Sequence, residues 1–363
     1  MTELRTALHL HSHYTGGTAS HAELLARALA ADLDVLITSD HNLLVDGLDG
    51  YAHENNKICL LLTAEEVFDR TLQPARSRLL VLDAGGELSP IAHKPRQVVR
   101  KAAENNGLAF LAHPFAAQHT ALGELLPPWT PEDIPDGIHG LEVWNSLSEL
   151  QGKAPRRLLA ALLAWFPRLA RRGPCPEACQ YWDEQLAAGE KLTAIAGSGL
   201  GGLPNAPQRL QHYLLTNLSN HLIVPRPLNG NLDEDRRMVL DALRQGHTFI
   251  ACDDLAPAEG FRFTAKGRDE KAAIGDTVTL KDSVTFQIRL PQAATCRLYK
   301  DGELIQKWED AEICVHNSTQ PGAYRVEALL TWLDQDVTWI LSNPIYVRPY
   351  VPPPLRDQLY DSY

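Results

Sequence analysis

HLHSHYTGG, residues 9–17, places three histidines at alternate positions at the end of the first predicted strand. Side chains at positions i and i+2 of a strand point to the same face, about 6.5–7 Å apart. His9, His11 and His13 therefore share one face, and two imidazoles at a strand end can bind one metal ion. The alternating histidines predict a metal site where the first strand ends.

The chain up to about residue 250 alternates short apolar runs with helical patterns. This alternation is typical of β–α units and predicts a largely parallel sheet in an α/β fold. Ser20 and Glu23 have the spacing of a capping box, which predicts a helix directly after Ser20. The further predicted strands are LDVLITSDH, KICLLLTAEEV, RLLVLDAGG, LAFLAHPF, GLEVWNS and LTAIAGSG.

Three segments depart from this pattern. A helix-rich insertion is expected near 155–190, with Trp165 and Phe166 in the core. From residue 253 to 350, apolar residues recur with a period near two, and Asp301-Gly302 indicates a hairpin, which predicts a small antiparallel β-sandwich. Residues 351–363 form a proline-rich tail. We expect residues 1–252 to form one domain and the sandwich a second.

Composition limits the classes of partner. The net charge is -11 and no basic cluster is present, so we expect no nucleic-acid partner. No run of about 18 apolar residues exists, which predicts no membrane span. The chain enters a strand pattern at once, leaving no secretory signal, and the six scattered cysteines fit a reducing compartment. We expect a cytoplasmic protein. Whether Cys296 and Cys314 pair, and the oligomeric state, stay open.

Further candidate metal donors stand at three other strand ends. Asp40 and His41 end one strand, Glu65 and Glu66 another, and His113 a third. In barrels of β–α units, functional side chains gather at the carboxyl ends of the strands. Histidine together with carboxylate suits Zn, Mn or Fe better than Ca. Cys175 and Cys179 are another possible metal pair, but no second pair follows, and a loop is the alternative.

Taken in order, HLHSHYTGG, TSDHN, AEEV, AHPF, EVWN and AGSGLGGLPNAP resemble the motifs of the PHP (polymerase and histidinol phosphatase) superfamily of metallohydrolases. The resemblance covers about residues 5 to 250, and the appended sandwich resembles the carbaryl-hydrolase-like branch. It implies a distorted (β/α)7 PHP-type barrel with two or three metal ions. It also implies hydrolysis of phosphate esters or, in this branch, of other esters.

The resemblance assigns roles to individual residues. Asp40 would support catalysis by orienting His41 or a bound water, and Arg78 replaces a family histidine, where it would bind an anionic substrate. Glu65 is the alternative to Glu66, and His13 is a substitute for a lost ligand. The implied metal ligands are His9, His11, His41, Glu66 and His113.

Two motifs lack family ligands. Thr15-Gly16-Gly17 stands where the family has Ser-Asp-Gly, and residues 197–201 read Gly-Ser-Gly-Leu-Gly where it has Gly-Ser-Asp-Ala-His. Glycine has no donor side chain, so we expect fewer than three metal ions. The central expectation is one ion, held by His9, His11 and Glu66.

The sequence leaves two functions open. One is a PHP-like metal-dependent hydrolase of a small phosphorylated or ester substrate, with a divalent transition metal (Zn, Mn or Fe) in a reduced site. The other is a catalytically inactive PHP-derived protein that binds a small ligand or a partner.

Overall fold

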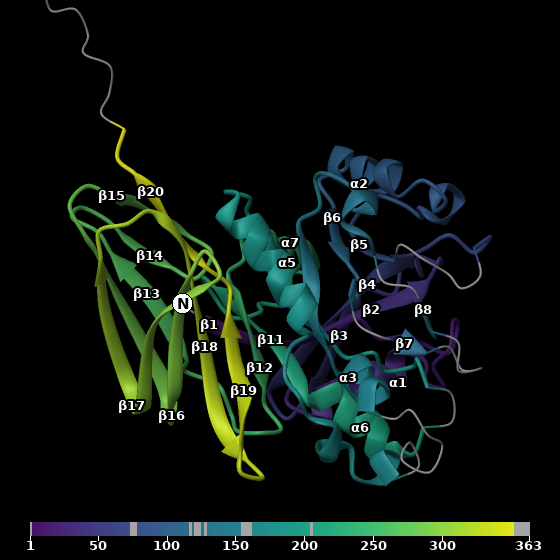
Figure 1. Cartoon of the computed structure of the whole chain (residues 1–363). Coiled ribbons are helices and arrows are strands. Elements are labelled where there is room, and N and C mark those ends of the chain that lie inside the picture. The colour runs from purple at the N-terminus through teal and green to yellow at the C-terminus, as the bar shows by residue number, and fades with distance from the viewer. Residues whose placement is uncertain are drawn as a thin grey trace, which may run out of the picture.

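The computed structural model describes residues 2–72, 78–115, 118–119, 125–126, 129–153, 162–203 and 206–351. The chain has an α/β part and a part made of strands, which lie side by side in Figure 1. Most of the predicted tail, from residue 352 on, lies outside the described residues, as do residues 154–161 of the predicted insertion. Among the described residues, no helix is long and apolar enough to cross a membrane.

The strands of the α/β part form a mixed sheet. β1, β2 and β4 pair in parallel, as do β6, β9 and β10, but β5 is antiparallel to both β4 and β6. The sheet is therefore mixed: these two groups pair in parallel as expected, and β5 interrupts them. These strands are β1 (Thr2–Leu8), β2 (Val35–His41), β4 (Lys57–Val67), β5 (Leu79–Leu82), β6 (Leu108–Leu111), β9 (Gly140–Asn145) and β10 (Thr193–Gly197).

Backbone hydrogen bonds join the residues that follow β10 to the end of β1. The amide of Ser198 donates to the Leu8 carbonyl at 2.9 Å, and the amide of Gly199 donates to the His9 carbonyl at 2.8 Å. β11 (Leu218–Val224) is antiparallel to β1, and its Asn220 side chain bonds both backbone groups of Ala196 at 2.8 Å. The ends of β1, β2, β4, β6 and β10 are thereby brought to one rim.

Helices cover this sheet (Figure 1). The capping box is confirmed, with Ser20 and Glu23 bonding each other's amides. α7 has an Asn231 cap and ends at Gly246 with φ +71°, a left-handed conformation that glycine adopts without strain. The helices are α1 (His21–Ala30), α2 (Pro95–Glu104), α3 (Ser146–Lys153), α5 (Pro176–Ala187), α6 (Gln208–Thr216) and α7 (Leu232–Gln245).

The predicted insertion contains α5, whose Trp182 is fully buried. Trp165 and Phe166, expected in the core, are instead 60% and 52% exposed. Short pieces complete the α/β part. They are β3 (Gly50–Glu54), β7 (Gln118–His119), β8 (Leu125–Leu126) and three 3-10 turns at Ser89–Ile91, Pro131–Asp133 and Pro167–Ala170.

The C-terminal strands pair mostly antiparallel around a core of their own, which includes Phe263, Phe286 and Tyr324. The hairpin at Asp301-Gly302 is confirmed, with φ of +50° and +84°. The strands are β12 (Thr248–Cys252), β13 (Arg262–Lys266), β14 (Lys271–Ala273), β15 (Thr277–Leu280), β16 (Val284–Lys300), β17 (Glu303–Ser318), β18 (Gly322–Trp332), β19 (Gln335–Ser342) and β20 (Ile345–Pro349).

Hydrogen bonding runs without a break from one part to the other. β12 pairs with β11 on one side and with β19 on the other. The Asn343 side chain accepts from the Ala194 amide at 2.8 Å and donates to its carbonyl at 2.9 Å. The change of sequence pattern after Cys252 is therefore not a gap in the sheet.

A buried ion cluster lies beside this junction. His221 on β11 places Nδ1 2.8 Å from Glu3 and Nε2 3.0 Å from Asp253. Burial lowers the pKa of His221, but its bonds to Asp253 and Glu3 outweigh burial and raise the pKa to about 9. A positively charged His221 donates to both carboxylates, so this cluster is satisfied only when the ring is protonated.

We expect His221 to make stability depend on alkaline pH. Because its folded-state pKa lies above the ordinary 6.5, its contribution is complete below pH 6.5 and is lost as pH rises through about 9. The contribution is on the order of 3 kcal/mol. Urea unfolding of wild type and His221→Gln should give a difference that shrinks over this window. Exposed His212→Gln is the control; a constant difference would contradict the assignment.

Candidate metal centre

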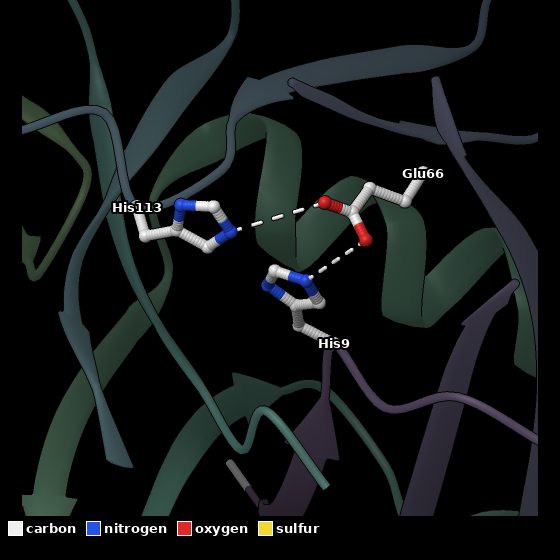
Figure 2. A group of neighbouring side chains, drawn as sticks. All are labelled: His9, Glu66 and His113. Atoms are coloured by element: carbon white, nitrogen blue, oxygen red, sulfur yellow. Dashed lines mark ion pairs between the residues drawn. The ribbon is translucent and has the colours of Figure 1, made fainter. Parts of the chain in front are cut away.

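Glu66 is the centre of the candidate site and is completely buried near the end of β4. Parallel pairing places His41 of β2 directly opposite it. Three imidazoles face its Oε2: Nε2 of His41 lies at 3.0 Å, and those of His9 and His11 lie at 3.5 Å. The fourth, His113, faces Oε1, with Nε2 at 3.8 Å (Figure 2). The structure thus brings together all five predicted metal ligands.

His9 and His113 come from the loops that directly follow β1 and β6, and both have left-handed backbone, with φ of +61° and +31°. Such a conformation costs a residue other than glycine on the order of 1–3 kcal/mol, so the surroundings must hold it. The Gly199 amide holds the His9 carbonyl, and the Glu142 carboxylate accepts from the His113 amide at 2.7 Å. These contacts fix two imidazoles against Glu66.

The outer ring nitrogens of two histidines are also held. Nδ1 of His11 lies 2.7 Å from the Ser39 carbonyl, and Nδ1 of His9 lies 2.9 Å from Glu142. A carbonyl only accepts, so Nδ1 of His11 donates, and a neutral ring then presents the lone pair of Nε2 to Glu66. Metal-binding histidines are typically held in this way.

The donor set fits a divalent transition metal. Glu66 Oε2 is buried and makes no hydrogen bond with any described residue, although three ring nitrogens surround it. Lone pairs that face a carboxylate oxygen at this distance repel one another unless a proton or a cation lies between them. Among the described residues, two groups have donor atoms within 4.8 Å of one another: His9, Glu66 and His113, and His11, His41 and Glu66. The expected grouping of His9 with His11 is not one of them.

The histidines around Glu66 have very different pKa values. Burial, with repulsion from His41, lowers the pKa of His11 to about 3. Burial also lowers the pKa of His113 to about 4. Burial acts the same way on His9, but the carboxylates of Glu142 and Glu66 prevail and raise its pKa to about 10. His11 and His113 are thus neutral donors at pH 7, whereas a metal on His9 must displace a proton.

Arg78 lies against Glu66, in the position beside Glu66 and His113 where the family resemblance places it. Its Nη1 is 2.8 Å from Glu66 Oε1, and its guanidinium carbon lies 4.2 Å above the Phe68 ring. The reversed direction of β5 explains this position, because it brings the start of that strand to the rim where β4 ends. Two unit charges about 4 Å apart interact by roughly 4 kcal/mol at an effective dielectric constant of 20. The arginine therefore opposes a cation at Oε1.

Asp40 is part of the site's support. Its recorded contacts with described residues do not include the His41 imidazole, and the other expected partner, a bound water, stays a prediction. In the described part of the chain, its carboxylate accepts from the Ser12 amide and hydroxyl and from the Thr15 hydroxyl, and it lies 3.4 Å from His21. Burial raises the pKa of Asp40, but bonds from His21, Thr15 and Ser12 prevail and lower it to about 2. Thr15 in turn accepts from the His41 amide at 3.0 Å. Asp40 thus holds the loop after His11.

The two substitute ligands lie elsewhere. Glu65 points away from Glu66, and its carboxylate accepts from the Leu88 amide at 2.7 Å. His13 is exposed, with its ring 4.3 Å from that of Tyr14. Neither residue belongs to the donor groups among the described residues.

Glu142 is the main site residue that sequence reasoning missed. Besides His9 and the His113 amide, its buried carboxylate bonds the Asn145 side chain at 2.9 Å. The sequence feature that indicates it is a single carboxylate inside the apolar strand GLEVWN, which contains the motif EVWN. A cleft of about 380 Å³ adjoins it, lined by His113, Trp144, Glu149 and Arg172 among others.

Several glycines of the two loops near the site have a backbone role. Gly201 has φ +97°, and a Cβ there would lie 2.7 Å from the His11 carbonyl. A Cβ on Gly17 would lie 2.2 Å from that same oxygen, and one on Gly199 (φ +67°) 2.4 Å from Leu147. Close packing of the two loops around His11 thus requires glycine, a reason that the sequence did not reveal.

Comparison with known proteins gives distant likeness only. No family model matches the chain, and no curated protein matches it. A two-domain protein from Bacteroides vulgatus that contains a predicted PHP-like metal-dependent phosphoesterase is 14% identical, with a TM-score of 0.40 over 94% of this chain and 95% of that one. A structure from Bifidobacterium adolescentis, also named a metal-dependent phosphoesterase, is 13% identical, with a TM-score of 0.35 over 64% and 95%.

A third solved structure, a lytic polysaccharide monooxygenase from Jonesia denitrificans, is 14% identical, with a TM-score of 0.16 over 20% of this chain and 57% of that one. All three TM-scores are below 0.5, so the functional argument depends on the geometry of the site.

Glu142→Gln should weaken Zn²⁺ binding about 10- to 100-fold, the usual cost of losing a partner that holds a metal-binding histidine. Titration calorimetry measures this directly. Glu149→Gln is the matched control, because Glu149 is also buried beside the cleft but accepts from the Arg172 and Gly173 amides. Equal losses in both variants would refute a specific role for Glu142.

Gly201→Ala should destabilise the fold by about 1–3 kcal/mol, because the new methyl group meets the His11 carbonyl in strained backbone. Gly50→Ala should change stability by about 0.5 kcal/mol or less, since nothing lies within 4 Å of a Cβ there. Urea unfolding compares the two. Similar values would mean that the loop adapts easily.

Proposed function

We propose that the chain is a PHP-like metal-dependent hydrolase of a small phosphorylated or ester substrate. The observation that carries the proposal is the convergence of the His9, His11 and His41 Nε2 atoms on Glu66 Oε2, a buried oxygen without a hydrogen bond from the part of the chain that the structure describes. This arrangement provides nitrogen and oxygen donors for Zn, Mn or Fe. Because the histidines must be deprotonated to bind, metal affinity should rise with pH.

The residues around the metal centre have distinct roles in this proposal. Glu142 and the Ser39 carbonyl hold the rings of His9 and His11, and Asp40 holds the loop that follows them. The cleft beside His113 gives a small substrate access. A divalent metal bound at such a centre supplies Lewis acidity and lowers the pKa of water to near neutrality.

The wider assignment belongs to the same proposal. It comprises a distorted (β/α)7 PHP-type barrel over residues 1–252 and a β-sandwich over 253–350, related to the carbaryl-hydrolase-like branch. The proposal places no catalytic side chain in the sandwich and locates the protein in the cytoplasm. Fewer than three metal ions are expected, with glycine in former ligand positions.

The alternative is a catalytically inactive binding protein of the same descent. One observation favours it: Arg78 already bonds Glu66, so part of the carboxylate's charge is balanced without a metal. In that case the cleft would bind a small ligand without converting it.

The two functions differ in a hydrolysis assay with added Mn²⁺, Zn²⁺ or Fe²⁺. We expect turnover of bis(p-nitrophenyl) phosphate, p-nitrophenyl phosphate or p-nitrophenyl acetate. His11→Ala should lower it about 100-fold or more, since a ligand contributes on the order of 3 kcal/mol. Exposed His212→Ala is the control and should keep full activity. A wild type that binds metal but is inert on all three substrates would support the binding protein.

A further inference from the structure

The two oxygens of Glu66 have different neighbours. Oε2 faces the imidazoles of His41, His9 and His11 at 3.0–3.5 Å. Oε1 bonds Arg78 at 2.8 Å and faces His113 at 3.8 Å. Figure 2 shows His9 and His113 on opposite oxygens of the carboxylate. One side of Glu66 therefore has a ring of histidines, and the other already has a cation.

Strand register fixes the position of Arg78. β5 lies between β4, which carries Glu66, and β6, which leads to His113. Arg78 directly precedes β5, and its carbonyl accepts from the Ala112 amide at 3.0 Å. Arg78 therefore comes from the strand between the two that position Glu66 and His113, the donors that a metal at Oε1 would need.

The guanidinium is also held in place. Its side chain is only 17% exposed, it stacks on Phe68, and it bonds a carboxylate that is fully buried. Arginine stays charged at every accessible pH, and its weakly hydrated planar group tolerates such burial better than lysine does. A permanent positive charge is therefore bonded to Glu66 Oε1, the oxygen that a second metal would share with His113.

We propose that Arg78 takes the place of a second metal cation, which makes this a one-metal centre. The metal position is the group formed by His11, His41 and Glu66 Oε2, and the His9 ring faces the same oxygen at 3.5 Å. His113 is then not a metal ligand. Among the predicted ligands it lines the cleft, so its ring is available to a substrate there. This inference rests on the proposed function for the presence of a metal.

Metal stoichiometry tests the inference without an activity assay. The full chain is loaded with Zn²⁺, desalted and analysed by mass spectrometry. Wild type should hold one ion and His41→Ala none. Arg78→Met should hold two, because the group formed by His9, Glu66 and His113 becomes free for a cation. Arg78→Lys keeps the charge and should stay at one.

The matched control is Arg70→Met. Arg70 is exposed and bonds the His41 carbonyl at 2.8 Å, so this variant loses the same charge at the rim without freeing Glu66 Oε1. It should still hold one ion. A gain of a second ion here would mean that net charge, and not the place of Arg78, limits binding, and would overturn the inference.

His113 supplies the second half of the test. His113→Gln should keep the single ion of wild type, but in the Arg78→Met background it should reduce two ions to one. Loss of the single ion in His113→Gln, two ions in wild type, or no gain in a folded Arg78→Met protein would each overturn the inference while the proposed hydrolase stands. No ion in wild type would overturn the proposed function as well. Circular dichroism confirms that each variant is folded.

Discussion

The Glu66 carboxylate carries its charge in a place that water does not reach, and the rim of the sheet is arranged around it. An ionised carboxylate loses several kcal/mol of hydration on burial, and only nearby positive charge or hydrogen-bond donors restore this. Here Arg78 and His41 provide the shortest contacts. The pKa of Glu66 lies well below its ordinary value, despite complete burial, because Arg78 and His41 outweigh the loss of hydration.

Around this charge, each supporting contact fixes a ligand through its backbone or its outer ring nitrogen. Glu142 bonds both the ring of His9 and the amide of His113, so one carboxylate places two imidazoles. Asp40 acts at longer range through Thr15, which links the loop after His11 to the His41 amide. The imidazoles therefore hold their positions through hydrogen bonds to the scaffold, which lowers the cost of organising a metal site when an ion binds.

The sequence predicted the α/β class of the N-terminal part, the capping box of α1 and the hairpin at Asp301-Gly302. It also predicted that the five expected metal ligands lie close together. These features depend on local spacing and on which residues end the strands. It did not predict the direction of β5, since a short apolar strand looks the same in either direction. The contact between Arg78 and Glu66 follows from that direction, and before the structure only the family resemblance placed Arg78 near Glu66 and His113. The partner of Glu142 and the backbone need for Gly201 depend on residues distant in the chain, which a single sequence does not reveal.

The continuous ladder from β11 through β12 to β19 means that the α/β part has no natural outer edge on this side. A chain cut after Cys252 would leave β12 with a row of free amides and carbonyls, and unpaired edges of this kind promote association between molecules. It would also remove Asn343, the partner of both backbone groups of Ala194. The C-terminal strands therefore cover an edge of the α/β part that would otherwise be open to pairing with another chain.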